Sequence, residues 1–296
     1  MITVFTPTYN RAYIITDLYH SLCRQSYKKF EWLIIDDGST DNTEELVDSF
    51  IDEKIIDIRY IKQSNGGKHT AINNGVHIAN GELFFIVDSD DQIVDNALER
   101  IMFHYDQIKD DESFAGVCGL KAFFNGEPVG GDFSYDILDC NSLDFRYKYH
   151  AKGDMAEVFK TKILKNYPFP EYKNECFCAE SIVWNKIALN YKLRYFKEKI
   201  YLCDYLPDGL SAKSFINRRR SIKTTTVYYS QLYKMPVPFF PKIKAAANYW
   251  RFAFYLKESF CIKVRQIGVS AIFLYPLGLI AYIRDRLRKS NQKRLI

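Results

Sequence analysis

Short apolar runs alternate with amphipathic stretches through the N-terminal third of the chain. The runs are rich in β-branched and aromatic side chains, which favour strands. They predict strands at residues 2–6, 31–36, 56–61 and 83–88. The stretches between them have helical periodicity and predict helices near residues 12–25, 41–52, 67–79 and 94–108. Strands that alternate with helices of this length indicate an α/β fold, in which helices cover both faces of a parallel sheet.

The pattern changes further along the chain. It is less regular from about residue 110, with a strand-like run at 113–124 and a helical stretch around 180–190, and it becomes helical and basic after residue 212. We therefore expect three parts, namely residues 1–109, 110–215 and 216–296.

Polar clusters follow three of the expected strands directly. They are Thr6-Pro7-Thr8-Tyr9-Asn10, Asp36-Asp37-Gly38-Ser39 and Asp88-Ser89-Asp90-Asp91. Because ligands bind beyond the carboxyl ends of the strands in such sheets, we expect the clusters to converge on one edge. Asp36 and Asp37 could accept hydrogen bonds from a base or from ribose hydroxyls, which predicts a nucleotide site. A capping box formed by Asp41 and Glu44 is the alternative, but it explains neither of those two aspartates.

The third cluster places three carboxylates within four positions. Carboxylates this close repel and raise one another's pKa unless a positive charge lies among them. A calcium loop would begin at Asp88, but Gln92 and Ile93 occupy its fifth and sixth positions, where an acidic or Asn residue and a glycine are needed. A solvated acidic turn remains open. One or two carboxylates that hold Mg²⁺ or Mn²⁺ against substrate phosphates fit the pattern better.

The stretch "QSNGGKHTAINNG" follows the third strand. Gly66 and Gly67 permit a close backbone approach, and the helix after them would offer N–H donors to an anion. The spacing is not that of a P-loop. A simple turn before a helix is an equally good interpretation.

Charge and hydropathy set the last part of the chain apart. The net charge is +5, and basic residues are concentrated in "INRRRSIK" and in the tail. Residues 267–283 are uncharged but are interrupted by Pro276 and Gly278, which favours a helix lying on a membrane over one that crosses it. A helical pair packed on the protein's own body is the alternative. Arg218, Arg219 and Arg220 either grip a diphosphate or form a solvated basic face.

The cysteines and the N-terminus bear on location. The seven cysteines are odd in number and show no paired spacing, which favours free thiols in a reducing compartment. The chain opens on a strand pattern and not on a signal peptide. We therefore expect a cytoplasmic protein, peripheral on the inner face of the cell membrane, with no nucleic-acid partner.

The motifs "TPTYNR", "DDGSTDNT", "NGGKHTAINNG" and "VDSDD", in this order and spacing, resemble family 2 glycosyltransferases of the GT-A fold over roughly the first 215 residues. The resemblance implies a Rossmann-like, mixed but mostly parallel sheet flanked by helices, with a helical C-terminal extension. It implies an inverting enzyme that moves a hexosyl or related group from a nucleotide diphosphate sugar, here a UDP-sugar, to an acceptor hydroxyl. The acceptor would be a glycan or a lipid-linked glycan of bacterial surface polysaccharide or glycolipid synthesis. Residues 1–109 would bind the nucleotide sugar and residues 110–215 the acceptor.

The resemblance also assigns roles by position. Pro7 and Tyr9 would line the base, Asp37 would contact it, Asp88 would touch the ribose, and Asp90 would hold the Mg²⁺ or Mn²⁺. The remaining nucleotide-sugar candidates are Thr6, Asn10, Asp36, Asn65, Gly67, Lys68 and Ser89.

The stretch "CFCAESIVWNKIAL" is similar to the family segment that supplies the carboxylate base just before a helix. Glu180 occupies that position, although Ser181 follows it where many members have aspartate. Asp154 and Asp208 are the alternatives. A carboxylate that only stabilises a helix N-terminus is the other interpretation of Glu180. A non-catalytic nucleotide-sugar-binding or membrane-scaffold protein is the competing function. A nucleotidyltransferase fits less well, because "TPTYNRA" lacks a glycine-rich basic turn.

Overall fold

The computed structural model describes residues 1–131, 133–206, 209 and 214–292, with the side chains after residue 287 excepted. The chain divides into two compact units. The first comprises Met1–Phe169 and Val183–Ala212, and the second comprises Pro170–Ile182 and Lys213–Ile296. Residues 170–182, which the sequence assigns to the acceptor half, thus cluster with the C-terminal helices.

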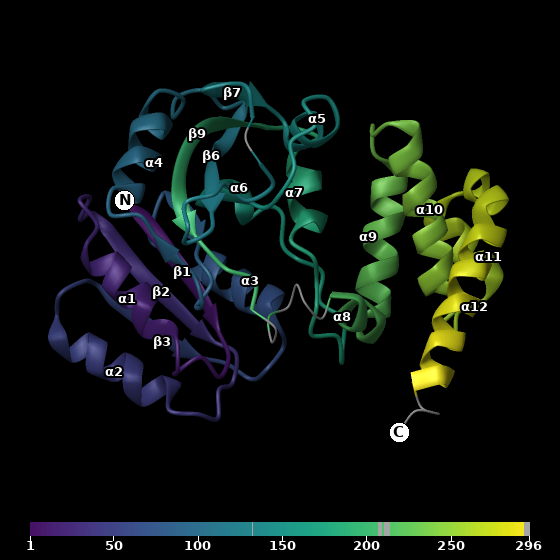
Figure 1. Ribbon diagram of the computed structural model, residues 1–296, viewed down its shortest axis with the longest axis horizontal. Helices are drawn as coiled ribbons and strands as arrows, with labels where there is room; N and C mark the ends of the chain where they lie inside the picture. The colour runs from purple at the N-terminus through teal and green to yellow at the C-terminus, as the bar shows by residue number, and fades with distance from the viewer. Residues whose placement is uncertain (132, 207–208, 210–213, 293–296) are drawn as a thin grey trace. The chain divides into compact units, whose positions relative to one another are not determined.

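The first unit is built on one sheet (Figure 1). Within the described residues its strands are β1 (Ile2–Thr8), β2 (Phe30–Asp36), β3 (Ile58–Lys62), β4 (Leu83–Ile86), β5 (Gln92–Ile93), β6 (Phe114–Ala122), β7 (Ile137–Cys140), β8 (Met155–Lys160) and β9 (Lys192–Leu202). Their order is β3-β2-β1-β4-β8-β6-β9-β5, and β7 also pairs with β9. Strands β3, β2, β1 and β4 are parallel, whereas β8 is antiparallel to both of its neighbours. The expected mixed sheet and its first four strands are confirmed.

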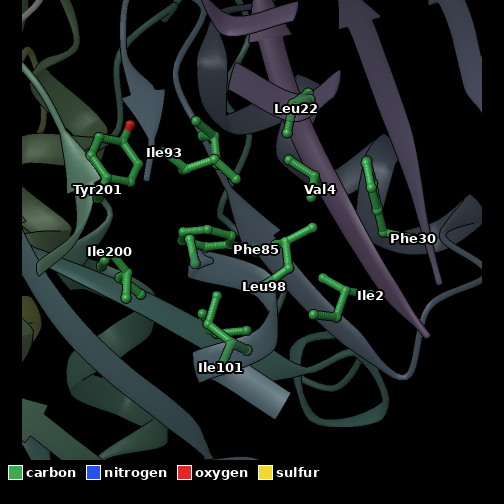
Figure 2. Close-up of a cluster of buried hydrophobic side chains, with 14 of the residues drawn as sticks. Ile2, Val4, Leu22, Phe30, Phe85, Ile93, Leu98, Ile101, Ile200 and Tyr201 are labelled. Carbon is green, nitrogen blue, oxygen red and sulfur yellow. The ribbon is translucent and has the colours of Figure 1, made fainter. Parts of the chain in front are cut away.

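Helices cover both faces of this sheet. They are α1 (Ile15–Cys23), α2 (Thr43–Glu53), α3 (Lys68–Ile78), α4 (Ala97–Asp106), α5 (Ser142–Tyr147), α6 (Thr161–Leu164) and α7 (Ser181–Ile187). Helices α1, α2 and α4 pack on one face, where Figure 2 shows part of their shared core with the inward side chains of β1 and β4. Helix α3 packs on the other face, and Gly75 lets it lie directly against the ring of Phe5. The four helices expected before residue 109 are therefore confirmed.

The second unit is helical. Its helices are α8 (Ser214–Arg220), α9 (Ile222–Lys234), α10 (Phe239–Ala253), α11 (Phe260–Ile267), the 3₁₀ helix η1 (Val269–Leu274) and α12 (Tyr275–Gln292). Helix α10 packs against both α9 and α12. Tyr249 and Trp250 are buried at the centre, and Arg251 forms a bidentate ion pair with Asp285 at 2.6 and 2.7 Å.

Part of the apolar segment 267–283 serves this core. Ile267 and Ala271 are fully buried, and a Cβ on Gly278 would lie 2.2 Å from the Cβ of Trp250. Among the described residues no single helix is long and apolar enough to cross a membrane. One pair of consecutive helical segments is long and apolar enough when the two are taken together, namely Phe260–Ile267 and Val269–Leu287. The pair is bent by 111° at the break between them.

Replacing Gly278 with valine is therefore expected to destabilise the second unit by about 1–3 kcal/mol, because the added methyl groups overpack the α10–α12 contact. Denaturant unfolding followed by circular dichroism measures this. Leu277→Val on the exposed side of the same helix is the matched control and should change stability by less than about 0.5 kcal/mol. Equal stability of Gly278→Val and wild type would show that α12 does not pack as described.

Candidate active site

The three polar clusters lie side by side at the carboxyl edge of the sheet. Strand β1 lies between β2 and β4, and all three are parallel. Thr8, the last residue of β1, is level with Asp36 at the end of β2. The predicted convergence of the clusters is thus present, and side-chain contacts connect each loop to the next.

The loop after β1 is held to the loop after β2. Asn10 has a positive φ of 53°, and its side-chain oxygen accepts a hydrogen bond from the Thr40 N–H at 2.8 Å. Its own N–H donates to the Ser39 hydroxyl at 2.8 Å. The Tyr9 side chain, in the same loop, is 48% exposed.

Two of the candidate residues on β1 and β2 are fully buried and bonded within the protein. The Thr6 hydroxyl accepts a hydrogen bond from the Trp32 indole N–H at 2.9 Å. Asp36 accepts one from the Ser39 N–H at 2.7 Å and another from the Tyr60 hydroxyl. Both side chains therefore support the strand ends from within the protein. The hydroxyl of Thr8, by contrast, is buried without a hydrogen-bond partner among the described residues.

Asp37 orders the turn that precedes α3. Its carboxylate accepts hydrogen bonds from the N–H groups of Gly66 and Gly67 at 2.8 and 2.7 Å and from the Gln63 amide at 2.8 Å. The Asn65 amide donates to the Asp37 carbonyl at 2.9 Å. Gly67 has a φ of 95°, which side chains disfavour. The backbone conformation of the turn thus favours glycine at position 67, and the Asp37 carboxylate holds the turn in place.

The acidic cluster is held by cations of the chain itself. Lys68, the first residue of α3, lies 2.6 Å from an oxygen of Asp88. Arg11, from the loop after β1, lies 3.6 Å from Asp90. From the sequence we expected a metal to supply the positive charge near these acids. Lys68 and Arg11 supply part of that charge. These two ion pairs complete a circle of contacts at the sheet edge. The circle runs through the pairs Asn10–Ser39, Asp37–Gly67, Lys68–Asp88 and Arg11–Asp90.

The three carboxyls respond differently to this environment. Burial alone would raise the pKa of Asp88, but the charges of Lys68 and Lys121 outweigh burial and lower it. Burial and the neighbouring Asp88 charge raise the pKa of Asp90 and raise that of Asp91 to about 7. The chain's own cations therefore favour the ionised form of Asp88, whereas the surroundings of Asp90 and Asp91 disfavour ionisation.

A divalent cation beside Asp90 would favour the ionised forms of these carboxyls. In the part of the chain that the structure describes, no three His, Cys, Asp or Glu side chains are arranged to hold a metal by themselves. Mg²⁺ and Mn²⁺ sites of this kind use one or two carboxylates and take their other ligands from substrate phosphates and water. Asp90 and Asp88 are the carboxylates available, and a metal there would offset the repulsion among the acids.

Sequence reasoning did not assign two further neighbours of the cluster. Tyr201 on β9 donates a hydrogen bond to Asp91, and the Lys121 ammonium on β6 lies 3.8 Å from the centre of the Tyr201 ring. Both strands belong to the half assigned to the acceptor. Tyr201 is 110 positions from Asp91 in the sequence and Lys121 is 30 positions from it, and only the strand order brings them together.

The candidate bases lie in different parts of the chain. Glu180 is half-buried immediately before α7, in the segment 170–182 of the second unit. Glu175 anchors that segment to α9, because its carboxylate accepts hydrogen bonds from the N–H groups of Lys223 and Thr224 at 2.7 and 2.9 Å. Asp154, in the first unit, accepts a hydrogen bond from the Tyr205 hydroxyl at 3.2 Å. Asp208 lies outside the described residues.

The arginine run 218–220 is partly engaged with aromatic rings. Arg218 stacks over Phe177, Tyr228 and Tyr229, and Arg219 lies over Tyr255. Cation–π packing of this kind stabilises the second unit. It favours a structural role for Arg218 over both interpretations drawn from the sequence.

The mixed sheet of this strand order, flanked by helices, has the architecture of the GT-A fold. The family described as Glycosyl transferase family 2 matches residues 3–129. The chain is 31% identical over 218 residues to glycosyltransferase GlyG of Streptococcus pneumoniae. The aligned residues cover 68% of this chain and 70% of GlyG. The chain belongs to glycosyl transferase family 2 and is a glycosyltransferase.

Solved structures agree on the fold. TarS of Staphylococcus aureus in complex with UDP-GlcNAc superposes with a TM-score of 0.68 at 18% identity, over 98% of this chain and 92% of that one. Mannosyltransferase PcManGT of Pyrobaculum calidifontis in complex with GDP-Man and Mn²⁺ gives 0.56 at 18% identity, over 99% and 86%. TarS of this species is a poly(ribitol-phosphate) β-N-acetylglucosaminyltransferase. Its sequence is 32% identical to this chain over 174 residues, which are 57% of this chain and 29% of TarS.

Proposed function

We propose that the protein transfers a sugar with inversion from a UDP-sugar to a hydroxyl of a surface glycan or lipid-linked glycan, with Mg²⁺ or Mn²⁺ at Asp90. The carrying observation is the circle of contacts at the sheet edge. These contacts join the loops after β1, β2 and β4 and the start of α3 around the acidic cluster. UDP-GlcNAc in TarS and Mn²⁺ in PcManGT support the donor and the metal.

The donor would occupy this circle of contacts from base to diphosphate. Pro7, Tyr9 and Asn10 would line the base. Asp37 would contact it as well, since a carboxylate offers about four lone-pair sites and three are used by the turn. Asp88 and Ser89 would face the ribose. Lys68, the first residue of α3, would face the phosphates, because the start of a helix favours anions.

Transfer with inversion is a single displacement at the anomeric carbon, so one base on the acceptor side suffices. Glu180 would accept the proton of the attacking hydroxyl. The bound metal would supply charge stabilisation for the leaving diphosphate. Arg11 and Lys68 would remain beside that charge, where each can donate to a phosphate oxygen.

The experiment that tests this function is release of UDP or GDP from a panel of nucleotide sugars, with Mn²⁺ or with EDTA. We expect one donor to be turned over only with the metal, faster when a glycan acceptor is added. Binding of a nucleotide sugar without turnover under every condition would favour the non-catalytic nucleotide-sugar-binding protein instead.

We propose further that the second unit holds the enzyme on the inner face of the cell membrane. Support comes from one side of η1 and α12, where apolar residues 46–88% exposed recur every three or four positions. This apolar stripe comprises Val269, Phe273, Leu277, Ile280, Ile283 and Leu287. Residues 213–296 carry 18 Lys and Arg against two acids, which suits an anionic lipid surface.

Replacing Phe273, Leu277 and Ile280 together with serine is expected to remove most binding to anionic vesicles, because each buried apolar side chain contributes about 1.5–3 kcal/mol. Flotation of the full chain with phosphatidylglycerol-containing vesicles measures this. The control carries serine at three other exposed apolar positions, all in the first unit, namely Phe103, Ile55 and Leu189. Flotation of the stripe variant at the wild-type level would exclude this surface.

A further inference from the structure

Tyr201 occupies an unusual place between the apolar core and the acidic cluster. It is fully buried on β9, and its ring packs edge-on against Phe85 of β4. Figure 2 shows it at the margin of the core beside Ile93, with its hydroxyl directed away from Phe85 and Ile200. Because a buried polar group needs hydrogen-bond partners, the partners of this hydroxyl indicate what the side chain does.

The partners are the two ends of the acidic loop. The Tyr201 hydroxyl donates to the Asp91 carboxylate at 2.6 Å and accepts from the Asp88 N–H at 3.0 Å. A tyrosine hydroxyl has one hydrogen to donate and lone pairs to accept with, so this single group satisfies both. Asp90 lies between these two attachment points and is not itself bound to Tyr201.

Strand pairing fixes the position of the tyrosine. Immediately after the acidic loop, Gln92 and Ile93 pair antiparallel with Leu202 and Tyr201. On the other side of β9, Tyr201 is level with Lys121 of β6, whose ammonium lies 3.8 Å from the ring centre. A desolvated cation over an aromatic face is attractive, and it resists movement of the ring.

We propose that Tyr201 is the positioning residue of the nucleotide-diphosphate site: by clamping Asp88 and Asp91 it fixes where the Asp90 carboxylate stands. This inference rests on the proposed function, because the acidic loop is the proposed ribose and metal site. A rigid loop presents its carboxylate without an ordering cost at each binding event, and preorganisation of this kind raises affinity. Because Tyr201 is fully buried, it would act through the loop and not by contact with the donor or the acceptor.

The test is Tyr201→Phe, which keeps the ring, its packing and the Lys121 contact but removes both hydrogen bonds. Binding of UDP in the presence of Mn²⁺, measured by titration calorimetry, is expected to weaken about tenfold or more, since a hydrogen bond to a charged group contributes about 1.5–3 kcal/mol. Amide exchange at residue 88 is expected to accelerate. Both readouts are independent of turnover.

Tyr105→Phe is the matched control. Its hydroxyl is also nearly buried and also donates to a carboxylate, that of Glu82. Both variants should lose comparable stability, but only Tyr201→Phe should lose affinity for UDP with Mn²⁺. If Tyr201 acts through Asp91, adding Tyr201→Phe to Asp91→Ala should weaken binding much less than it does in wild type.

Unchanged UDP affinity in a folded Tyr201→Phe, or equal losses in Tyr201→Phe and Tyr105→Phe, would overturn the inference. So would full additivity with Asp91→Ala. The proposed function fails separately, when the wild-type protein itself binds no UDP with Mn²⁺.

Discussion

Asp90→Asn is expected to lower metal-dependent sugar transfer about a thousandfold. A metal acting as Lewis acid contributes several kcal/mol to a transition state that develops charge on the leaving diphosphate, and each 1.36 kcal/mol is tenfold in rate. The protein should stay folded, because burial and the Asp88 charge already disfavour the ionised Asp90 and raise its pKa. The measurement is the initial rate of UDP release with saturating donor and Mn²⁺.

Asp95→Asn controls for the loss of an acidic side chain near the same loop. Asp95 pairs with Arg24 at 3.0 Å, and its side chain is largely exposed. It should retain the wild-type rate. Wild-type turnover by Asp90→Asn would remove Asp90 from the metal site.

Glu180→Gln is expected to leave donor binding intact and to lower transfer by a factor of about 10²–10⁴, the usual contribution of a general base. Glutamine keeps the size of the side chain and cannot take the proton of the acceptor hydroxyl. The measurements are the affinity for UDP with Mn²⁺ and the rate of transfer to an acceptor.

Glu171→Gln, an exposed change in the same segment 170–182, is the control and should leave both values unchanged. Asp154→Asn is the informative comparison. Loss of transfer in Asp154→Asn together with full activity in Glu180→Gln would move the base role to Asp154.

The sequence predicted the first four strands and helices because each is a local pattern. Residues 2–6 and 83–88 are apolar runs bounded by polar residues, and the structure extends or shortens them by only a few positions. The convergence of the polar clusters followed from the parallel order of β2, β1 and β4, which strand–helix alternation implies.

The contacts around the acidic loop could not be predicted in the same way. Arg11, Lys121 and Tyr201 reach the loop through strand neighbours that are distant in sequence, and no periodic pattern encodes those pairings. The sequence did not predict that Thr6 and Asp36 are fully buried and hydrogen-bonded within the protein, because both belong to motifs that indicate contact with a ligand. Residues 267–283 were read as one apolar segment, whereas the structure divides them between a buried side at Ala271 and Gly278 and an exposed side at Phe273 and Ile280.

If the acidic loop binds a nucleoside diphosphate through a metal at Asp90, UDP affinity should depend on both the metal and that carboxylate. The decisive measurement is titration of UDP into the wild-type protein and into Asp90→Asn, each with Mn²⁺ and with EDTA. We expect Mn²⁺ to tighten UDP binding at least tenfold in the wild type and to have no such effect in Asp90→Asn. Equal UDP affinity with Mn²⁺ and with EDTA in the wild type, or the same tightening in both proteins, would show that Asp90 does not hold a metal for the nucleotide.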